Sequence, residues 1–338
     1  STNPKVKFEL LKGISGGKDY FTNIGLVKKE FKALVEKADA VVIRFPSTIG
    51  LWCAEVCKQK NIAYATEVVG CAWDATWNYG SLFTRILAPY VYFKMKKAVR
   101  QSIASIYVTQ FFLQKRYPNP GGITSYASNV RIDDFEQEVL DNHLARLDKQ
   151  PAVPVLGLIG NLEVKYKGFD VAMAALAIVK ASGVKCKLKL VGGGGSQYVN
   201  QLIEKYGLQD YVEVVGRLES GDAVFQFLDD LDLYVHPSRQ EGLPRSVIEA
   251  MGRGCPVLAS TVAGIPELLD SRYLHKPGNH KLLAQQILDV LPQKEELKNM
   301  ANQNFVKAKA YTNEILSDRR SRFWRDVAEK FKSLEAHA

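Results

Sequence analysis

The stretch EGLPRSVIEAMGRGCPVLASTVAGIPE, residues 241–267, decides the fold of the second half of the chain. It predicts one short helix, because Pro244 suits a first helical turn and the sequence Gly-Cys-Pro ends the helix. The segment VLAS that follows predicts a short buried strand. Two carboxylates flank the helix start, Glu241 before it and Glu249 eight residues later. Free helix amides bind anions and carboxylates accept hydrogen bonds from hydroxyls, so the stretch suits a ligand with an anionic centre and hydroxyl-rich flanks.

Predicted strands and helices alternate along both halves of the chain. In the second half each strand is followed by a helix, as in Rossmann-type βα units, and the first half alternates in the same way. This alternation predicts an α/β fold with parallel sheets covered by helices. The predicted strands are residues 6–11, 38–47, 62–70, 104–109, 124–133, 154–160, 186–195, 211–218, 233–238 and 257–260.

The composition is that of a globular protein with room for two domains. The 338 residues are 46% apolar and 24% charged, and the formal net charge is +9. A basic chain suits a phosphorylated ligand, an anionic membrane surface or nucleic acid. The sequence contains no zinc-finger or RNP-like motif and no dominant basic run with interleaved aromatics, so we expect no nucleic-acid partner.

The five cysteines predict buried free thiols. Their number is odd, they form no CxxC pair, and no histidine or second cysteine pair completes a zinc site. No stretch reaches the roughly 18 apolar residues that a membrane-spanning helix needs. We therefore expect a cytoplasmic protein, either free or at the inner face of the cytoplasmic membrane.

Four loops follow the carboxyl ends of predicted strands in the second half, where ligands bind in parallel sheets. They bring two lysines, a glycine run and a helix start to one edge, a combination that would hold a diphosphate. Each feature alone has an ordinary alternative, because loop lysines are often only solvated and glycines often only form turns. The loops are residues 160–168 with Lys165 and Lys167, residues 192–195, residues 216–218 and residues 238–241.

The segment 82–101 mixes large apolar and basic side chains. One interpretation is a peripheral membrane contact that sorts the two kinds onto different faces. The interpretation that we favour is an ordinary helix pair, broken or kinked near Pro89, with its aromatics in the core and its lysines solvated. The side chains concerned are Phe83, Ile86, Leu87, Tyr90 and Phe93 with Arg85, Lys94, Lys96, Lys97 and Arg100.

A loop with Trp73, Asp74 and Trp77 is predicted after the strand at residues 62–70. Loops at this place often contact ligands, so Asp74 is a candidate acceptor-side residue; it could equally cap a loop or helix.

Several other nucleotide-binding and hydrolytic motifs are missing from the sequence. The run GGGG at residues 192–195 matches GxGxxG only in part, and no acidic residue follows at the next strand end, which disfavours a dinucleotide oxidoreductase. There is no Walker lysine motif, no GxSxG and no HExxH. There is also no DxD-like cluster near a strand end, so we expect no metal.

The quoted stretch resembles the donor-site signature of the retaining family-4 glycosyltransferases, which have the GT-B fold. Segments 159–170, 190–195, 212–218 and 231–238 fall in the same order as in that family, and the first half is similar more loosely. The resemblance implies two Rossmann-like domains whose parallel sheets face each other across a cleft. It further points to the bacterial surface-polysaccharide enzymes, because EGLPR is a spelling associated with them.

The resemblance also implies roles for individual residues. Glu241 matches the family's glutamate beside the donor sugar, and Glu249 matches the glutamate that binds the ribose hydroxyls of the nucleotide. Lys167 matches the lysine that binds the diphosphate, so Lys167 and Glu241 are the implied catalytic residues. The implied donor-binding set is Gly160, Asn161, Lys165, Gly193, Gly216, Arg217, Gly242, Leu243, Pro244, Arg245 and Glu249.

One departure from the family concerns charge. The family usually has an arginine six residues before the lysine, and this chain has Asn161. The lost charge should weaken stabilisation of the leaving diphosphate unless Lys165 or Arg245 supplies it.

A second departure concerns the start of the chain. The family begins with a strand and a glycine-rich loop that this sequence does not show, so we expect an N-terminal domain that lacks its first βα unit. Either the chain is incomplete or the domain is reduced. The expected division is residues 1–150 for this acceptor-side domain, residues 151–312 for the C-terminal nucleotide-sugar-binding domain, and residues 313–338 for a helix that crosses back.

The implied activity is transfer of a sugar, with retention, from a nucleotide-diphosphate sugar to a hydroxyl of a glycan or lipid-linked acceptor. The nucleotide sugar, in UDP or GDP form, is a co-substrate, and no cofactor or metal is expected. The main alternative is a catalytically silent nucleotide-sugar-binding protein or partner subunit. A 2-epimerase on the same fold and a basic scaffold at the membrane are further alternatives.

Overall fold

The computed structural model describes residues 17–336 except residues 80, 134, 135 and 150. The strand predicted at residues 6–11 lies outside the described residues. In the described part of the chain, no helix has both the length and the apolar character needed to cross a membrane.

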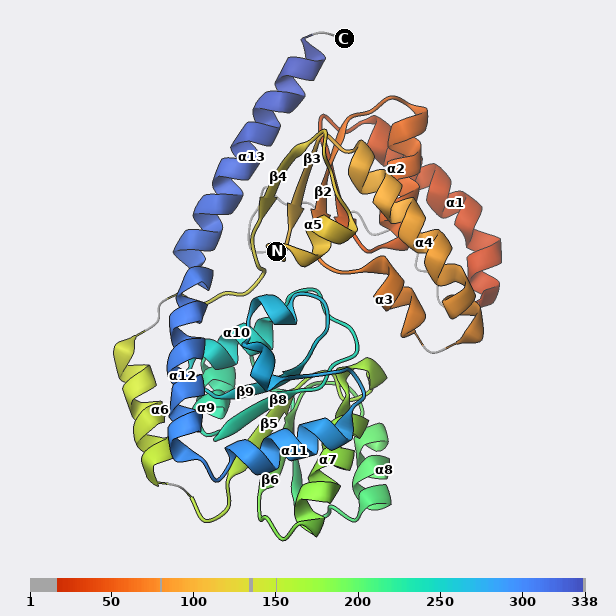
Figure 1. Cartoon of the computed structure of the whole chain (residues 1–338). Helices are drawn as coiled ribbons and strands as arrows, with labels where there is room; N and C mark the ends of the chain where they lie inside the picture. The colour runs from red at the N-terminus through yellow and green to blue at the C-terminus, as the bar shows by residue number, and fades with distance from the viewer. Residues whose placement is uncertain (1–16, 80, 134–135, 150, 337–338) are drawn as a thin grey trace.

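Two parallel sheets organise the chain (Figure 1). The first half forms a four-stranded sheet in the order β1-β2-β3-β4, and the second half forms a six-stranded sheet in the order β10-β9-β8-β5-β6-β7. Every described strand pair is parallel, as the alternation of strands and helices predicts. The strands are β1 (Val41–Phe45), β2 (Tyr64–Val68), β3 (Ala104–Tyr107), β4 (Ile123–Tyr126), β5 (Val155–Ile159), β6 (Lys187–Val191), β7 (Val212–Gly216), β8 (Leu233–His236), β9 (Val257–Ser260) and β10 (Leu274–His275).

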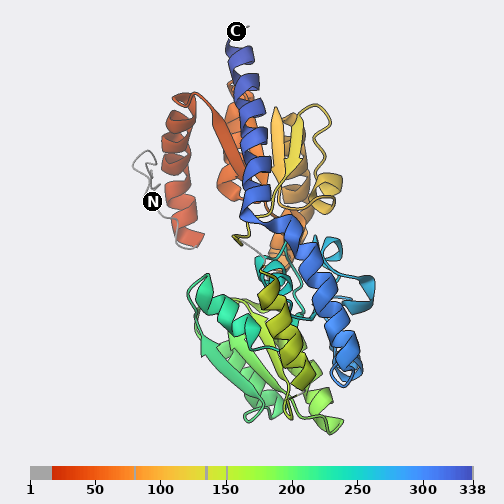
Figure 2. The same cartoon turned by 90° about the vertical axis from the view of Figure 1, so that its left-hand side faces the viewer.

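Helices pack around both sheets, and the last helix returns to the first sheet. Figures 1 and 2 show α13 running beside the first sheet, where it packs against β4. The α-helices are α1 (Gly17–Glu36), α2 (Thr48–Gln59), α3 (Ala72–Trp77), α4 (Leu82–Gln101), α5 (Phe112–Arg116), α6 (Gln137–Lys149), α7 (Phe169–Ala181), α8 (Gln197–Tyr206), α9 (Asp222–Asp229), α10 (Arg245–Gly252), α11 (His280–Val290), α12 (Lys294–Ala308) and α13 (Asn313–Glu335).

The predicted α/β fold with two parallel sheets is confirmed, and each strand predicted within the described residues is present. The loop predicted around Asp74 is wrong, because residues 72–77 form α3. Trp73 and Trp77 stand four residues apart on this helix and stack with ring centroids 5.6 Å apart, because residues at this spacing are neighbours on a helix surface. Helix α6 is absent from the predicted elements; it packs on α12, and its Arg146 pairs with Asp232 of the second half at 3.2 Å.

Helix α4 runs without a break through Pro89. The Ser81 side chain caps its start by accepting a hydrogen bond from the Thr84 amide at 3.1 Å. The expectation that its aromatic residues lie in the core is wrong for Phe83, Tyr90 and Phe93, which are all exposed.

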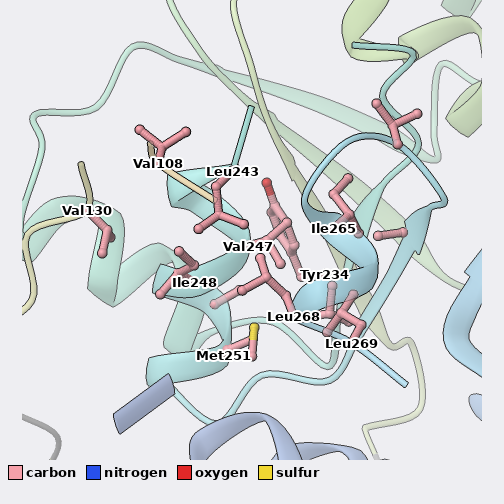
Figure 3. Packing of buried hydrophobic residues seen from close by; sticks show 14 of the residues in the cluster. Val108, Val130, Tyr234, Leu243, Val247, Ile248, Met251, Ile265, Leu268 and Leu269 are labelled. Atoms are coloured by element: carbon pink, nitrogen blue, oxygen red, sulfur yellow. The ribbon is translucent and has the colours of Figure 1, made fainter. Parts of the chain in front are cut away.

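The quoted stretch lies in the centre of a core that continues across the junction of the two sheets (Figure 3). Val247, Ile248 and Met251 of α10 are fully buried there. Val108 and Val130, which follow β3 and β4 of the first sheet, belong to the same cluster. The predicted burial of the cysteines is also confirmed, since all five are buried free thiols.

Candidate functional site

A cavity of about 620 Å³ lies between the carboxyl ends of the two sheets. Parallel strands bring residues from distant loops to one edge, which explains why the predicted site residues meet here. The second half contributes the loops after β5 and β8 and the start of α10. The predicted site residues that line the cavity are Gly160, Lys167, Glu241, Gly242, Leu243, Pro244, Arg245 and Glu249.

Close backbone contacts hold the loops after β5 and β8 against each other. Gly168 has a φ angle of 80°, and a Cβ atom at this position would lie 2.2 Å from the carbonyl oxygen of Pro237. The Arg239 guanidinium donates to both carboxylate oxygens of Asp170, at 2.8 and 2.7 Å. Only glycine fits at residue 168, and these contacts fix the position of the neighbouring Lys167.

Lys167 and Glu241 form an ion pair inside the cavity. Nζ of Lys167 lies 2.8 Å from Oε1 of Glu241, and Nε2 of His236 lies 2.9 Å from the same oxygen. The Glu241 side chain is only 9% exposed. Burial raises the pKa of Glu241, but Lys167 and His236 outweigh burial and hold the pKa at about 2. Glu241 is therefore an anion at neutral pH that orients the Lys167 ammonium.

His236 contacts Glu241 of this pair. It is missing from the predicted site residues. Its ring is 2% exposed, and Nδ1 lies 3.3 Å from the Tyr234 hydroxyl, which donates to Oγ of Ser246 at 2.9 Å. This chain of polar groups links Glu241 to the first turn of α10. The sequence signal for His236 is weak, because a lone histidine at a strand end is as often a core residue.

Glu249 also lines the cavity, one helical turn after Arg245. Burial raises the pKa of Glu249, and the positive charge of Arg245 opposes this shift. Within the described residues no side chain caps the start of α10, which follows Pro244. The first amides of α10 can therefore bind an anion between the two carboxylates.

Five predicted donor-site residues lie outside the cavity lining. Lys165 is exposed, and its ammonium lies 5.8 Å from the ring centroid of Tyr198. The Asn161 side chain accepts a hydrogen bond from the Glu163 amide at 3.0 Å. Lys165 thus contacts α8, and Asn161 bonds within its own loop. The five residues are Asn161, Lys165, Gly193, Gly216 and Arg217.

The glycine-rich loop after β6 contacts the loop after β5. A Cβ atom at Gly192 would lie 1.7 Å from the carbonyl oxygen of Gly160. Glu163 accepts a hydrogen bond from the Gly195 amide at 2.8 Å. The glycines therefore let two loops pack closely, and a ligand contact of this loop stays a prediction.

Asp74 lies apart from the cavity, on α3. Its carboxylate is 3.8 Å from the Arg116 guanidinium. Burial raises the pKa of Asp74, and Arg116 opposes the shift. An acceptor-side role of Asp74 stays a prediction.

The first half supplies cavity residues that are missing from the predicted set. Arg44, Val69, Val108 and Asn129 line the cavity, and each stands at or just beyond the carboxyl end of a strand of the first sheet. A Cβ atom at Gly242 would lie 2.0 Å from the carbonyl oxygen of Val69. The backbone of the second half thus touches the backbone of the first at the cavity wall.

Comparison with known proteins identifies the family. A family described as "Glycosyl transferases group 1" matches residues 153–293. Protein CapJ of Staphylococcus aureus is 33% identical over 311 residues, which cover 86% of this chain and 77% of that protein. The chain belongs to the group 1 glycosyl transferases. The prediction of a glycosyltransferase enzyme is thereby confirmed.

Further relatives and solved structures resemble this group 1 glycosyl transferase. The putative colanic acid biosynthesis glycosyltransferase WcaL of Escherichia coli (strain K12) is 34% identical over 149 residues, 41% of this chain and 36% of that protein. Sucrose-phosphate synthase from Thermosynechococcus elongatus has a TM-score of 0.72 at 19% identity, over 93% of this chain and 80% of that one. HepE from Anabaena, solved with UDP and glucose, has a TM-score of 0.63 at 19% identity, over 93% and 83%. The structural likeness confirms the GT-B arrangement.

A second cavity of about 820 Å³ extends the cleft of this group 1 glycosyl transferase towards α13. Arg44, Asn129, Arg245 and Glu249 line both cavities, so the two are continuous. Arg320 of α13 forms part of the wall of the second cavity.

Proposed function

We propose that this enzyme transfers a sugar from a nucleotide-diphosphate sugar to an acceptor hydroxyl, with retention at the anomeric carbon. The observation that carries the proposal is the partly buried pair of Lys167 and Glu241 beside the uncapped start of α10. In transfer, negative charge develops on the departing diphosphate, and a fixed ammonium and helix amides stabilise such charge. Glu241 orients the ammonium, and we assign Glu249, which lines the same cavity, to the ribose hydroxyls of the nucleotide.

Arg245 is the best candidate for the second cation of the site. Asn161 replaces the arginine that is usual in the family, and Lys165 is turned towards Tyr198. Arg245 lines both cavities. We therefore assign the second contact to the diphosphate to Arg245, and Arg245→Gln should lower kcat/KM by about 10-fold or more, as expected for loss of one charged hydrogen bond.

The donor that we propose is a UDP-sugar. HepE, which shares the fold, was solved with UDP and glucose, whereas no feature of the cavity by itself selects the base. A thermal-shift panel of UDP- and GDP-sugars tests this choice. A donor at 100 times its dissociation constant should add about 2.7 kcal/mol to the free energy of unfolding. A response to GDP-sugars alone would contradict the UDP assignment.

The acceptor that we propose is a glycan or lipid-linked glycan in bacterial polysaccharide assembly, on the cytoplasmic side of a membrane. The name of WcaL, which assigns it to colanic acid biosynthesis, supports this proposal. We further propose that transfer needs no metal, because Lys167 supplies a cation at the diphosphate. Activity that survives EDTA, and a product whose anomeric configuration equals that of the donor by NMR, are the expected results.

The decisive experiment compares Lys167→Ala with Lys165→Ala. Lys165 stands two residues earlier on the same loop and lies outside the cavity lining, so it is a matched control. Removal of Lys167 should lower turnover of radiolabelled donor by about 10- to 150-fold, and removal of Lys165 should not. Equal turnover in both variants and in Glu249→Ala would refute the proposal. Tight donor binding without any turnover in the wild type would identify a silent binding protein.

A further inference from the structure

The outer face of α4 exposes large apolar side chains. Leu82, Phe83 and Ile86 are 75%, 73% and 72% exposed. Tyr90 and Phe93 further along the helix are also more than half exposed. We call these five residues the α4 face; Figure 1 labels α4 in the first half of the chain. A contiguous apolar surface of this kind marks an interaction site in a water-soluble protein.

The α4 face is not needed to hold the helix on the protein. The opposite side of α4 is buried through Ala88, Met95, Ala98 and Val99. Residues 82, 86, 90 and 93 recur at intervals of three and four, so they form one stripe of the helix surface. Within the described residues, the stripe therefore stays exposed while α4 is packed.

Basic side chains continue the same stripe. Lys94, Lys97 and Arg100 are exposed in the second half of α4. The helix carries five lysines and arginines and no aspartate or glutamate. An apolar segment followed by cations on one helix face is the pattern of a helix that lies in the interface of an anionic membrane.

The apolar end of α4 lies near the candidate functional site. Asn78, just before α4, donates a side-chain hydrogen bond to the carbonyl oxygen of Arg239 at 3.3 Å. Arg239 belongs to the loop after β8 that also carries Glu241, and its guanidinium donates to the Lys165 carbonyl at 3.3 Å. A surface that the α4 face contacts is therefore adjacent to the loops that hold Lys167 and Glu241.

We propose that the α4 face docks on an anionic lipid bilayer, with its apolar residues among the acyl chains and Lys94, Lys97 and Arg100 at the headgroups. A second copy of the chain is the poorer occupant, because two such faces would bring their cations together. Docking through the apolar end of α4 would present a lipid-linked acceptor to the cleft. This presentation of the acceptor rests on the proposed function, whereas docking itself does not.

Vesicle sedimentation tests the proposal without any donor or turnover. The wild type should sediment with vesicles of phosphatidylcholine and phosphatidylglycerol, and much less with phosphatidylcholine alone or at high salt. The double variant Phe83→Ser with Ile86→Ser should bind at least about 10-fold more weakly, given the apolar area that it removes. The matched control is Val306→Ser on α12, because Val306 is similarly exposed at 67%.

The charge contribution is tested with Lys94→Glu and Lys97→Glu. Each lysine should contribute about fivefold to binding of anionic vesicles, whereas Lys205→Glu on α8 should have no effect. The proposal would be overturned if the wild type did not sediment with anionic vesicles, or if the α4 variants bound these vesicles as tightly as the wild type. Loss of a dimer in the serine variant, with vesicle binding unchanged, would assign the face to a second copy instead.

The proposed transfer activity is measured separately, as slow hydrolysis of the donor in solution. The serine variant should hydrolyse donor as the wild type does, since the α4 face lies outside the cavity lining. If the wild type bound vesicles but did not hydrolyse donor, the proposed transfer function would be refuted and the docking proposal would stand.

Discussion

Glu241 keeps its charge at a position where burial opposes ionisation. A buried carboxylate ordinarily takes up a proton, and only close cations reverse this preference. Here Lys167 and His236 converge on one oxygen of Glu241. The favourable interaction with the ionised form makes Glu241 a stabilising residue as well as a candidate site residue.

Removal of this charge should make stability less dependent on pH. The pKa of Glu241 falls from 4.5 to about 2 on folding, so its contribution is fully present above about pH 5 and disappears as the pH falls towards 2. Glu241→Gln should lower the free energy of unfolding by roughly 2–4 kcal/mol at neutral pH and progressively less in acid. Urea titrations across this pH range measure the difference; Glu295→Gln, at an exposed position, is the control. A constant difference at every pH would contradict the assignment.

At the scale of elements, two helices depend on side chains from distant parts of the chain. Helix α5 begins at three amides that donate to the Glu267 carboxylate, those of Gln110 at 2.7 Å, Phe111 at 3.1 Å and Phe112 at 2.6 Å. Glu267 belongs to the second half of the chain and α5 to the first, so this cap links the two.

Glu267→Gln should weaken this cap, because an amide side chain carries no charge and has one acceptor oxygen instead of two. The expected loss in the free energy of unfolding is about 1–2 kcal/mol. Urea unfolding measures the loss, with Glu219→Gln at an exposed position as the control. Equal stability of the two variants would show that the cap contributes nothing.

Helix α13 is held on the first sheet by Arg320. Its guanidinium lies 3.2 Å from Glu67, and it donates to the carbonyls of Ala127 and Ser128 at 3.1 and 3.3 Å and to the Asn129 side chain. Arg320→Ala should speed amide hydrogen exchange along α13 and cost about 1–3 kcal/mol of stability.

The control is Arg322→Ala, because Arg322 pairs only with Asp318 on the same exposed helix surface among its described contacts. Exchange in α13 that is equally fast in both variants would contradict a specific role of Arg320.

The elements of the second half could be predicted from the sequence because local signals agree there. Buried strands, helix stops and loop glycines recur in a regular order. Lys167 and Glu241 stand in loops at strand ends, whereas Glu249 lies inside α10 and is implied by the family resemblance. In the first half, the same local signals do not predict which side chains are buried. Phe83 and Tyr90 satisfy a core pattern and yet face outward, because burial depends on which helix face meets the sheet. The strand-end residues of the first sheet join the site only through the relative placement of the two halves. His236 belongs to the second half, and the sequence does not reveal it because a lone histidine at a strand end is as often a core residue.

At the scale of the whole molecule, the two halves meet through backbone as well as side chains. Gly242 and Val69 touch at the cavity wall, and the core around α10 includes Val108 and Val130 of the first half. A side chain at residue 242 would therefore not fit at the present separation of the two halves.

Gly242→Ala should push the halves apart, because the added Cβ atom would lie 2.0 Å from the Val69 carbonyl oxygen. This oxygen belongs to the backbone, which moves at a higher energy cost than a flexible side chain. A displacement of about 1 Å between reacting groups lowers turnover by roughly 100-fold. Donor turnover and the radius of gyration in solution scattering measure the two effects. The control is Gly121→Ala, where nothing lies within 4 Å of the added atom. A variant with wild-type turnover and dimensions would show that closer approach of the halves is not required.

The Glu267 cap has a consequence for building hybrid enzymes. Exchanging one half of this chain for that of a relative would test which half determines the choice of donor and which the choice of acceptor. A hybrid joined between α5 and β5 takes the amides of residues 110–112 from one parent and residue 267 from the other. If the second parent lacks a carboxylate at residue 267, the amides at the start of α5 lose their acceptor in the hybrid. Hybrids should therefore be screened first for the match at this one contact.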